Sequence, residues 1–234
     1  MAHTPDKRAG AGLPDDSAAV DAFLARLDAT APRAQRGPGR LMFVLDATMS
    51  RQPTWDRACH LQADMFDAAA EVGGIEVKLV FFRGRRECRA SGWMADPAAL
   101  GVKMAGVRCQ GGLTQIGRAL RHALAQEPHP DALVYVGDAC EEPADPLCHQ
   151  ASELGARGTP VFLFHEGGHP VPARVFKEMA RLSGGAYLPF SEASADQLRE
   201  LLRAVAVFTG GGRRALESAG DAGARRLLAA LPPS

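Results

Sequence analysis

The sequence predicts an α/β fold: a Rossmann-like, open, mostly parallel β-sheet with one antiparallel edge strand and with helices on both faces. Three observations predict it. From Arg40 onward, short apolar runs alternate with longer stretches of helical periodicity, as in a series of βα units. Runs such as LMFVLDA and ALVYVGD are apolar without alternation, which is typical of strands buried on both faces. The turn RGRRE joins two strand-like runs and is too short to carry a parallel crossover, so that pair is antiparallel.

The length of 234 residues is enough for one ordinary domain with tails. We expect an N-terminal tail, a short helix and a linker in residues 1–39, and the main domain in residues 40–209. Residues 210–234 then form a C-terminal extension, in which the segment from about 224 to 231 could add a helix.

The composition excludes several classes of protein. Hydrophobic residues make up 46% and charged residues 23%, as in folded globular proteins. Lys plus Arg and Asp plus Glu are 27 each, so no net field favours nucleic acid or an anionic membrane as a partner. No apolar run approaches the roughly 20 residues that span a bilayer, and the N-terminus opens no apolar signal region, so we expect a cytoplasmic protein. The five cysteines lack CxxC spacing, which favours reduced thiols.

The first half of the chain contains five expected elements in order. Residues 17–30 have apolar residues at helical spacing behind a possible Ser17 cap. Residues 41–47 are a buried strand, and the helix that follows opens with a proline in its first turn, where a missing amide hydrogen costs little. The remaining elements are that helix over 53–72, a strand over 75–84 and the antiparallel edge strand over 87–94.

The second half continues the alternation of helices and strands. A helix is expected from Thr114 to Gln126, after a glycine-containing loop. Buried strands are expected at 132–138 and 160–167, with a final short strand at 185–190. The intervening and closing helices are expected at 145–157, 171–183 and 195–208, the last with a clear apolar stripe.

Polar side chains follow two of the predicted strands at their carboxyl ends. Asp46 ends the first strand, with Thr48 and Ser50 just after it, and Asp138 ends the strand over 132–138. In an open parallel sheet these strand ends share one rim, where ligands usually bind. Two carboxylates held close together repel each other, so a cation between them is the simplest explanation.

The residue types indicate which cation. Thr48 and Ser50 lie two and four residues after Asp46, a spacing that lets one tight loop aim three oxygens at one point. Thr114 adds a further hydroxyl after Gly111 and Gly112, which allow a close backbone approach. Ligand sets made only of oxygen favour Mg²⁺, Mn²⁺ or Ca²⁺ over zinc. The expected metal site therefore consists of Asp46, Thr48, Ser50, Thr114 and Asp138.

These residues resemble the metal ion-dependent adhesion site (MIDAS) of the von Willebrand factor A family. DATMS at 46–50 corresponds to the family's DxSxS, followed by Thr114 in GGLT and Asp138 in VYVGD, and the likeness covers roughly 41–208. The resemblance implies a Rossmann-like domain, not an enzyme, that binds a protein partner presenting an Asp or Glu to the metal. It also implies that partner binding can couple to movement of the helix over 195–208.

The sequence departs from the family pattern at two places. Thr48 replaces the first serine, which keeps the hydroxyl but adds a methyl group. Asp138 is followed by Ala139 and Cys140 and then by two acids, Glu141 and Glu142, which we interpret as a solvated loop feature. Both departures bear on how strongly the site would hold metal.

Several alternatives stay open from the residues alone. Asp46, Thr48 and Ser50 could cap a helix without metal, and Thr114 could be the N-cap of its own helix. A haloacid dehalogenase-like phosphatase would use Asp46 as nucleophile, but Thr48 stands where its second Asp is expected. A third possibility is a von Willebrand-like interaction scaffold that binds its partners without metal.

Three further motifs are weaker. Cys140, Cys148 and His149 lack a fourth ligand for zinc. FHEGGHP contains glycines and a proline that favour a strand-end loop over a helical zinc motif. The basic run RGRR is interpreted most simply as a solvated hairpin turn, and the lack of interleaved aromatic residues disfavours the alternative of a nucleic-acid contact.

Overall fold

The computed structural model describes residues 37–70, 72–191 and 195–233, so the predicted helix over 17–30 lies outside the described residues. One six-stranded sheet organises the chain, in the order β3-β2-β1-β4-β5-β6. All neighbouring strands are parallel except β2 and β3. The strands are β1 (Gly39–Asp46), β2 (Ile75–Arg83), β3 (Glu87–Ala90), β4 (Ala132–Gly137), β5 (Val161–Glu166) and β6 (Ala186–Phe190).

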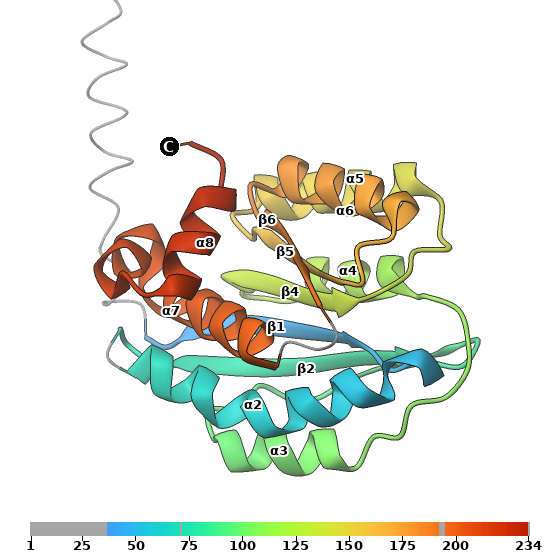
Figure 1. Cartoon of the computed structure of the whole chain (residues 1–234), viewed down its shortest axis with the longest axis horizontal. Coiled ribbons are helices and arrows are strands. Elements are labelled where there is room, and N and C mark those ends of the chain that lie inside the picture. The colour runs from blue at the N-terminus through green and yellow to red at the C-terminus, as the bar shows by residue number, and fades with distance from the viewer. Residues whose placement is uncertain (1–36, 71, 192–194, 234) are drawn as a thin grey trace, which may run out of the picture.

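The helices cover both faces of this sheet (Figure 1). One buried cluster lies between the sheet and α2, α3, α7 and α8, and a second lies between the sheet and α4, α5 and α6. The helices are α2 (Gln52–Ala70), α3 (Pro97–Ala105), α4 (Ile116–Leu124), α5 (Ala144–Ala156), α6 (Pro170–Ser183), α7 (Ala195–Ala219) and α8 (Ala222–Ala230), with a short 3₁₀ helix η2 (Met49–Arg51) before α2.

The predicted fold class and its antiparallel edge strand are confirmed. β1, β4 and β5 are buried along nearly their whole length, as uniformly apolar runs in a covered parallel sheet should be. The edge strand is shorter than expected: β3 is four residues long, and beyond it Met94 makes only an isolated bridge to Val77. The short turn before β3 enforces the antiparallel pairing, as the sequence indicates.

Two helices differ from expectation. α3 has no counterpart among the predicted elements; Asp96 caps it by accepting a hydrogen bond from the Ala98 amide, and its buried Leu100 and Met104 pack into the core. α7 continues past residue 208 to Ala219, with a break at Gly212, whose φ of 71° only glycine adopts readily. The glycine run at 210–212 therefore separates α7 into two helical segments joined at a kink, and the first of them ends near the predicted residue 208.

The C-terminal segment packs against the rest of the molecule. Leu216, Ala224 and Leu227 are buried in the cluster beneath α7. A Cβ atom at Gly223 would lie 2.4 Å from the Glu200 carbonyl oxygen, so glycine is needed for α8 to approach α7 this closely. None of the helices in the described part of the chain is both long and apolar enough to cross a membrane.

Candidate metal centre

The parallel sheet places the two predicted aspartates on adjacent strands. β1 and β4 pair in parallel with Leu45 opposite Val136, so Asp46 and Asp138 come at neighbouring strand ends. The chain passes from β1 to β2 on one side and later to β4 on the other, which makes this edge the topological switch point of the sheet. The rim identified from the sequence is therefore the place where open α/β sheets bind ligands.

The segment after β1 folds into a tight turn. Asp46 is buried, and its Oδ1 accepts a hydrogen bond of 2.8 Å from the Thr48 amide, which curls the chain back on the carboxylate. The 3₁₀ helix η2 then brings Ser50 round, so that Thr48 Oγ1 and Ser50 Oγ lie 3.4 Å apart. The spacing of two residues between Asp46, Thr48 and Ser50 therefore places their side-chain oxygens on the same side of the turn, as expected from the sequence.

Ser50 connects the two strand ends. Its hydroxyl donates to Asp138 Oδ2 over 3.2 Å, across 88 positions of sequence. Two carboxylate oxygens of the site, Oδ2 of Asp46 and Oδ1 of Asp138, are shielded from solvent. Burying a carboxylate oxygen is costly without a compensating group, and a cation is one kind of group that compensates it.

Thr114 reaches the same rim from the loop before α4. This threonine is buried, its amide donates to Glu141 Oε2 over 2.7 Å, and its Oγ1 accepts from the Glu141 amide over 3.1 Å. The loop itself is held close to the β2–β3 turn. A Cβ atom at Gly112 would lie 2.0 Å from the Gly84 carbonyl oxygen, so position 112 must be glycine.

All five predicted residues line one small pocket of about 250 Å³. Their oxygens are two carboxylates and three hydroxyls, a set that fits a hard divalent cation which keeps some water or accepts an outside ligand. No cluster of three or more His, Cys, Asp and Glu side chains suited to a metal occurs among the described residues. The pocket is lined by Asp46, Thr48, Met49, Ser50, Gly111, Gly112, Thr114, Asp138, Ala139 and Glu141.

The interpretation of Glu141 and Glu142 as a solvated loop feature is incomplete, because both carboxylates accept hydrogen bonds from backbone amides at or just before the start of α4. Glu142 accepts hydrogen bonds from the Ile116 amide at 2.5 Å and the Gly117 amide at 3.0 Å, so it caps the N-terminus of α4 from another segment. Burial raises the pKa of the Glu142 carboxyl, while these amides act in the opposite direction. Thr114 is not the helix N-cap: that position is Gln115, which makes no side-chain cap bond.

The end of β5 contacts Asp138 on one strand end and α2, which follows Ser50, on the other, but it does not line the pocket. His165 is fully buried; its Nε2 lies 3.3 Å from the Asp138 carbonyl oxygen and its Nδ1 lies 2.9 Å from the Tyr187 hydroxyl. Glu166 is also buried, and the Thr54 hydroxyl in the first turn of α2 donates to its carboxylate at 2.6 Å. The FHEGGHP motif thus begins in β5, continues through a strand-end loop as expected, and ends at Pro170, the first residue of α6.

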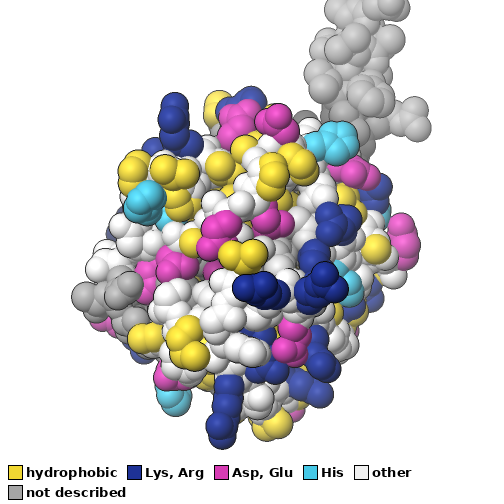
Figure 2. Space-filling view, turned by 90° about the vertical axis from the view of Figure 1, so that its right-hand side faces the viewer, with side chains coloured by type: hydrophobic (Ala, Val, Ile, Leu, Met, Phe, Trp, Pro, Cys, Tyr) yellow, Lys and Arg dark blue, Asp and Glu magenta, His cyan; other side chains and the backbone are white. Residues whose placement is uncertain are grey.

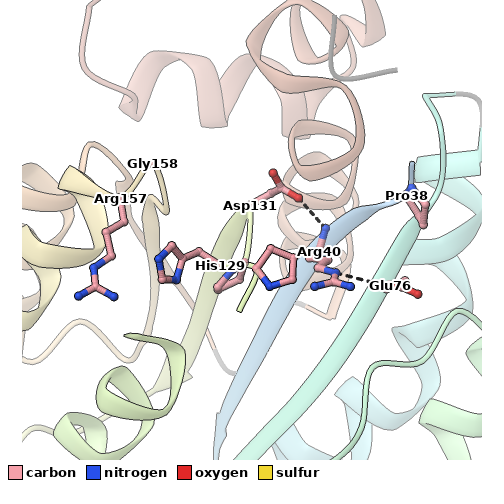
Figure 3. Close-up of a pocket in the computed structure, with 9 residues that line it drawn as sticks. Pro38, Arg40, Glu76, His129, Asp131, Arg157 and Gly158 are labelled. Carbon is pink, nitrogen blue, oxygen red and sulfur yellow. Dashed lines mark hydrogen bonds and ion pairs between the residues drawn. The ribbon is translucent and has the colours of Figure 1, made fainter. Parts of the chain in front are cut away.

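A larger pocket of about 580 Å³ lies at the opposite, amino-terminal end of the strands (Figure 3). Its two carboxylates have partners within the protein: the Arg40 backbone amide donates to Asp131 Oδ2 over 2.9 Å, and the Arg40 guanidinium Nε lies 3.3 Å from Glu76 Oε2. His129 and Arg157 line its other side. None of the predicted site residues belongs to this pocket.

Comparison with solved structures identifies similar folds. A von Willebrand factor type A protein from Catenulispora acidiphila aligns with 73% of this chain and 42% of its own, at 17% identity and a TM-score of 0.59. The VWA domain of SpRpn10 aligns with 72% of this chain and 95% of its own, at 12% identity and a TM-score of 0.54. At identities this low, the similarity shows that the folds are alike and nothing further.

A third neighbour carries a metal. Proximal thread matrix protein 1 from the mussel byssus, in a structure with a zinc-occupied MIDAS motif, aligns with 73% of this chain and 45% of its own, at 19% identity and a TM-score of 0.53. No protein-family model and no curated protein sequence matches the chain.

Proposed function

On the premise that the chain has the fold of a von Willebrand factor A domain, we propose that it is a protein-binding module that works through a divalent cation. The cation would accept a carboxylate from an Asp or Glu of the partner. The proposed ligands, directly or through water, are Asp46, Thr48, Ser50, Thr114 and Asp138.

The observation that carries the proposal is the convergence of these five residues, from three separate segments, on one pocket. The Ser50 hydrogen bond to Asp138 joins the first and last segments, and the Thr114 hydrogen bond to Glu141 joins the second to the loop after β4. Helix capping or turn formation explains each segment alone, but it does not explain why the three segments meet in one pocket. A cation that all three bind explains their meeting.

Each residue has a distinct role in this proposal. Asp46 and Asp138 supply the negative charge, and the three hydroxyls supply neutral oxygens, so the bound cation keeps positive charge for an outside carboxylate. A cation bound there supplies electrostatic attraction for that carboxylate. We propose Mg²⁺ as the ion, with Mn²⁺ or Ca²⁺ as alternatives, because every donor is oxygen. The Thr48 methyl group lies beside these donors and influences how closely the ion fits.

Calorimetric titration of the folded protein with MgCl₂ and MnCl₂ tests the metal site. We expect one site, weakened at least about 100-fold in Asp46→Asn and in Asp138→Asn, since even partners outside the ligand shell change metal affinity by 10–100-fold. Asp131→Asn is the matched control, because it removes an equivalent charge at the other end of the strands. Unchanged metal affinity in both site variants would contradict the proposal.

The same variants separate the remaining alternatives. An interaction scaffold without metal predicts no heat of Mg²⁺ or Mn²⁺ binding to the wild-type protein. A phosphatase predicts hydrolysis of an aryl phosphate that Asp46→Asn abolishes. We propose that the protein is not an enzyme: Thr48 stands two residues after Asp46, where the acid/base aspartate of that chemistry belongs.

A further inference from the structure

A basic edge lies beside the acidic pocket. The β2–β3 hairpin over 83–90 and the loop over 108–113 together contain five arginines and one glutamate. That glutamate, Glu87, pairs with Arg83 at 2.8 Å and with Arg89 at 2.7 Å. The exposed Arg85, Arg86 and Arg108 therefore leave this edge positive on a chain whose total charge is balanced.

Backbone contacts fix this edge against the pocket. The Gly84 amide donates to the Gln110 carbonyl and the Leu113 amide donates to the Gly84 carbonyl, each over 3.3 Å. Gly112, which lines the pocket, touches the same Gly84 carbonyl so closely that no side chain fits. Arg85 directly follows Gly84, whose carbonyl oxygen lies against the pocket-lining Gly112. These backbone contacts fix the backbone of the hairpin beside the pocket.

Two apolar side chains also stand at the pocket. Met49 lines it and is 61% exposed, and Leu113, between the lining residues Gly112 and Thr114, is 55% exposed. They are two of the four large hydrophobic side chains exposed in the described part of the chain. Exposed apolar side chains bordered by polar groups are typical of a protein-contact surface.

The view onto the carboxyl ends of the strands agrees with this arrangement (Figure 2). Acidic and hydrophobic side chains occupy the middle of this face, and a group of Lys and Arg side chains lies next to them. The face therefore presents three kinds of group side by side: a candidate cation site, apolar side chains and a basic edge.

From this arrangement we infer that the partner is an acidic protein segment, which the protein recognises through three contacts. One carboxylate binds the metal, an apolar residue next to it contacts Met49 and Leu113, and a second Asp or Glu pairs with Arg85 and Arg86. Arginine suits this last role because its guanidinium group binds a carboxylate with two parallel hydrogen bonds. The inference rests on the proposed function and adds which partner sequence the site selects.

A nucleic acid fits the same surface less well. Two exposed apolar side chains, Met49 and Leu113, stand at the pocket, and a phosphate backbone has no apolar group to place against them. The hairpin segment over 83–90 also contains no aromatic residue on which a base could stack. The exposed apolar side chains and the lack of a stacking residue in the hairpin therefore favour an acidic protein segment.

A peptide-display selection tests the inference. The library carries random twelve-residue peptides with a fixed central Glu, and it is selected on the folded protein in MgCl₂ and in EDTA. For the wild type we expect enrichment only in MgCl₂, of peptides with an apolar residue near the Glu and a second acid. For Arg85→Glu/Arg86→Glu we expect the MgCl₂ requirement to persist while the preference for a second acid disappears.

Affinities of a wild-type-selected peptide make the test quantitative. We expect about tenfold weaker binding to Arg85→Glu/Arg86→Glu, since each exposed ion pair contributes up to about fivefold and reversal adds repulsion. Arg203→Glu/Arg214→Glu is the control, because it changes charge equally on exposed positions of α7. Thermal unfolding of each variant verifies that it is folded.

The outcomes distinguish the two proposals. If the wild type enriches no peptide in a MgCl₂-dependent way, the proposed function fails. If enrichment depends on MgCl₂ but Arg85→Glu/Arg86→Glu selects the same peptides, the function stands and the inference is overturned. Binding of a 20-nucleotide duplex or single strand that only Arg85→Glu/Arg86→Glu abolishes would also overturn it, in favour of a nucleic-acid surface.

Discussion

A charged pocket lies at each end of the β-sheet, and the two differ in how their charges are arranged. At the amino-terminal end, the Arg40 guanidinium pairs with Glu76 and the Arg40 backbone amide donates to Asp131, so both carboxylates have partners within the protein. At the carboxyl-terminal end, two aspartates and three hydroxyls converge. The amino-terminal pocket is the larger one. The proposed metal site is thus the smaller pocket, and the proposal rests on the convergence of like groups and not on pocket volume.

The largest expected effect concerns the glycine that holds the pocket loop. A Cβ atom at Gly112 would lie 2.0 Å from the Gly84 carbonyl oxygen, whereas at Gly111 it would meet nothing within 4 Å. We expect Gly112→Ala to lower the free energy of unfolding by about 3 kcal/mol and to weaken Mg²⁺ binding. Gly111→Ala should change stability by less than about 0.5 kcal/mol. Urea unfolding measures both, and equal effects would refute the close contact.

The next effect concerns the support of α2 by the end of β5. Thr54→Val keeps the shape of the side chain but removes the hydroxyl that donates to the buried Glu166 carboxylate. The loss should cost about 2 kcal/mol, because the acceptor is a buried charged group. We also expect about tenfold weaker Mg²⁺ binding, since α2 directly follows the Ser50 segment. Thr54→Ser retains the hydroxyl and should restore both properties in urea unfolding and calorimetry.

At the amino-terminal end we expect a smaller loss of stability and no loss of Mg²⁺ affinity. Asp131→Ala removes the acceptor of the Arg40 amide and should lower the free energy of unfolding by about 1 kcal/mol. Mg²⁺ affinity should stay within a factor of about two of the wild type, because the change is at the far end of the strands. A large change in the Mg²⁺ titration would mean that the two ends of the sheet are coupled.

The smallest expected effect is that of the partly exposed ion pair between Arg40 and Glu76. Glu76→Gln should change the free energy of unfolding by less than about 0.5 kcal/mol, because exposed pairs contribute little and salt screens them. The difference should vanish in 1 M NaCl, where the Debye length is about 3 Å. A loss above about 2 kcal/mol in urea unfolding would show that the pair supports β1 and β2 more strongly than its exposure suggests.

The strands were predictable from sequence because their signal is local. β1, β4 and β5 are uninterrupted apolar runs, and the predicted ranges agree with the structure to within a residue or two at most ends. α3 was not predictable in the same way, since it is short and contains Gly101, which weakens the helical pattern. The continuation of α7 was hidden by the glycines at 210–212, which ordinarily end a helix.

The candidate site was predictable for the residues that follow strands. Asp46 and Asp138 are identified by the strand ends alone, because adjacent parallel strands place them on one rim. The contributions of Glu142 and Glu166 were not visible, because each acts on a helix that is distant in sequence. Only the folded backbone shows that these carboxylates reach the first turns of α4 and α2.

The pairing of α7 with α8 affects how the domain can change conformation. A terminal helix that ends in solvent can shift along its axis by breaking few contacts. Here α7 continues through Gly212 into a segment that turns into α8, and Arg226 of α8 donates to the Pro189 carbonyl of β6 at 2.6 Å. An axial shift of α7 must therefore carry α8 with it or separate the two helices first. The segment over 213–230 therefore adds contacts that would have to move with α7, or break, in any axial shift of that helix.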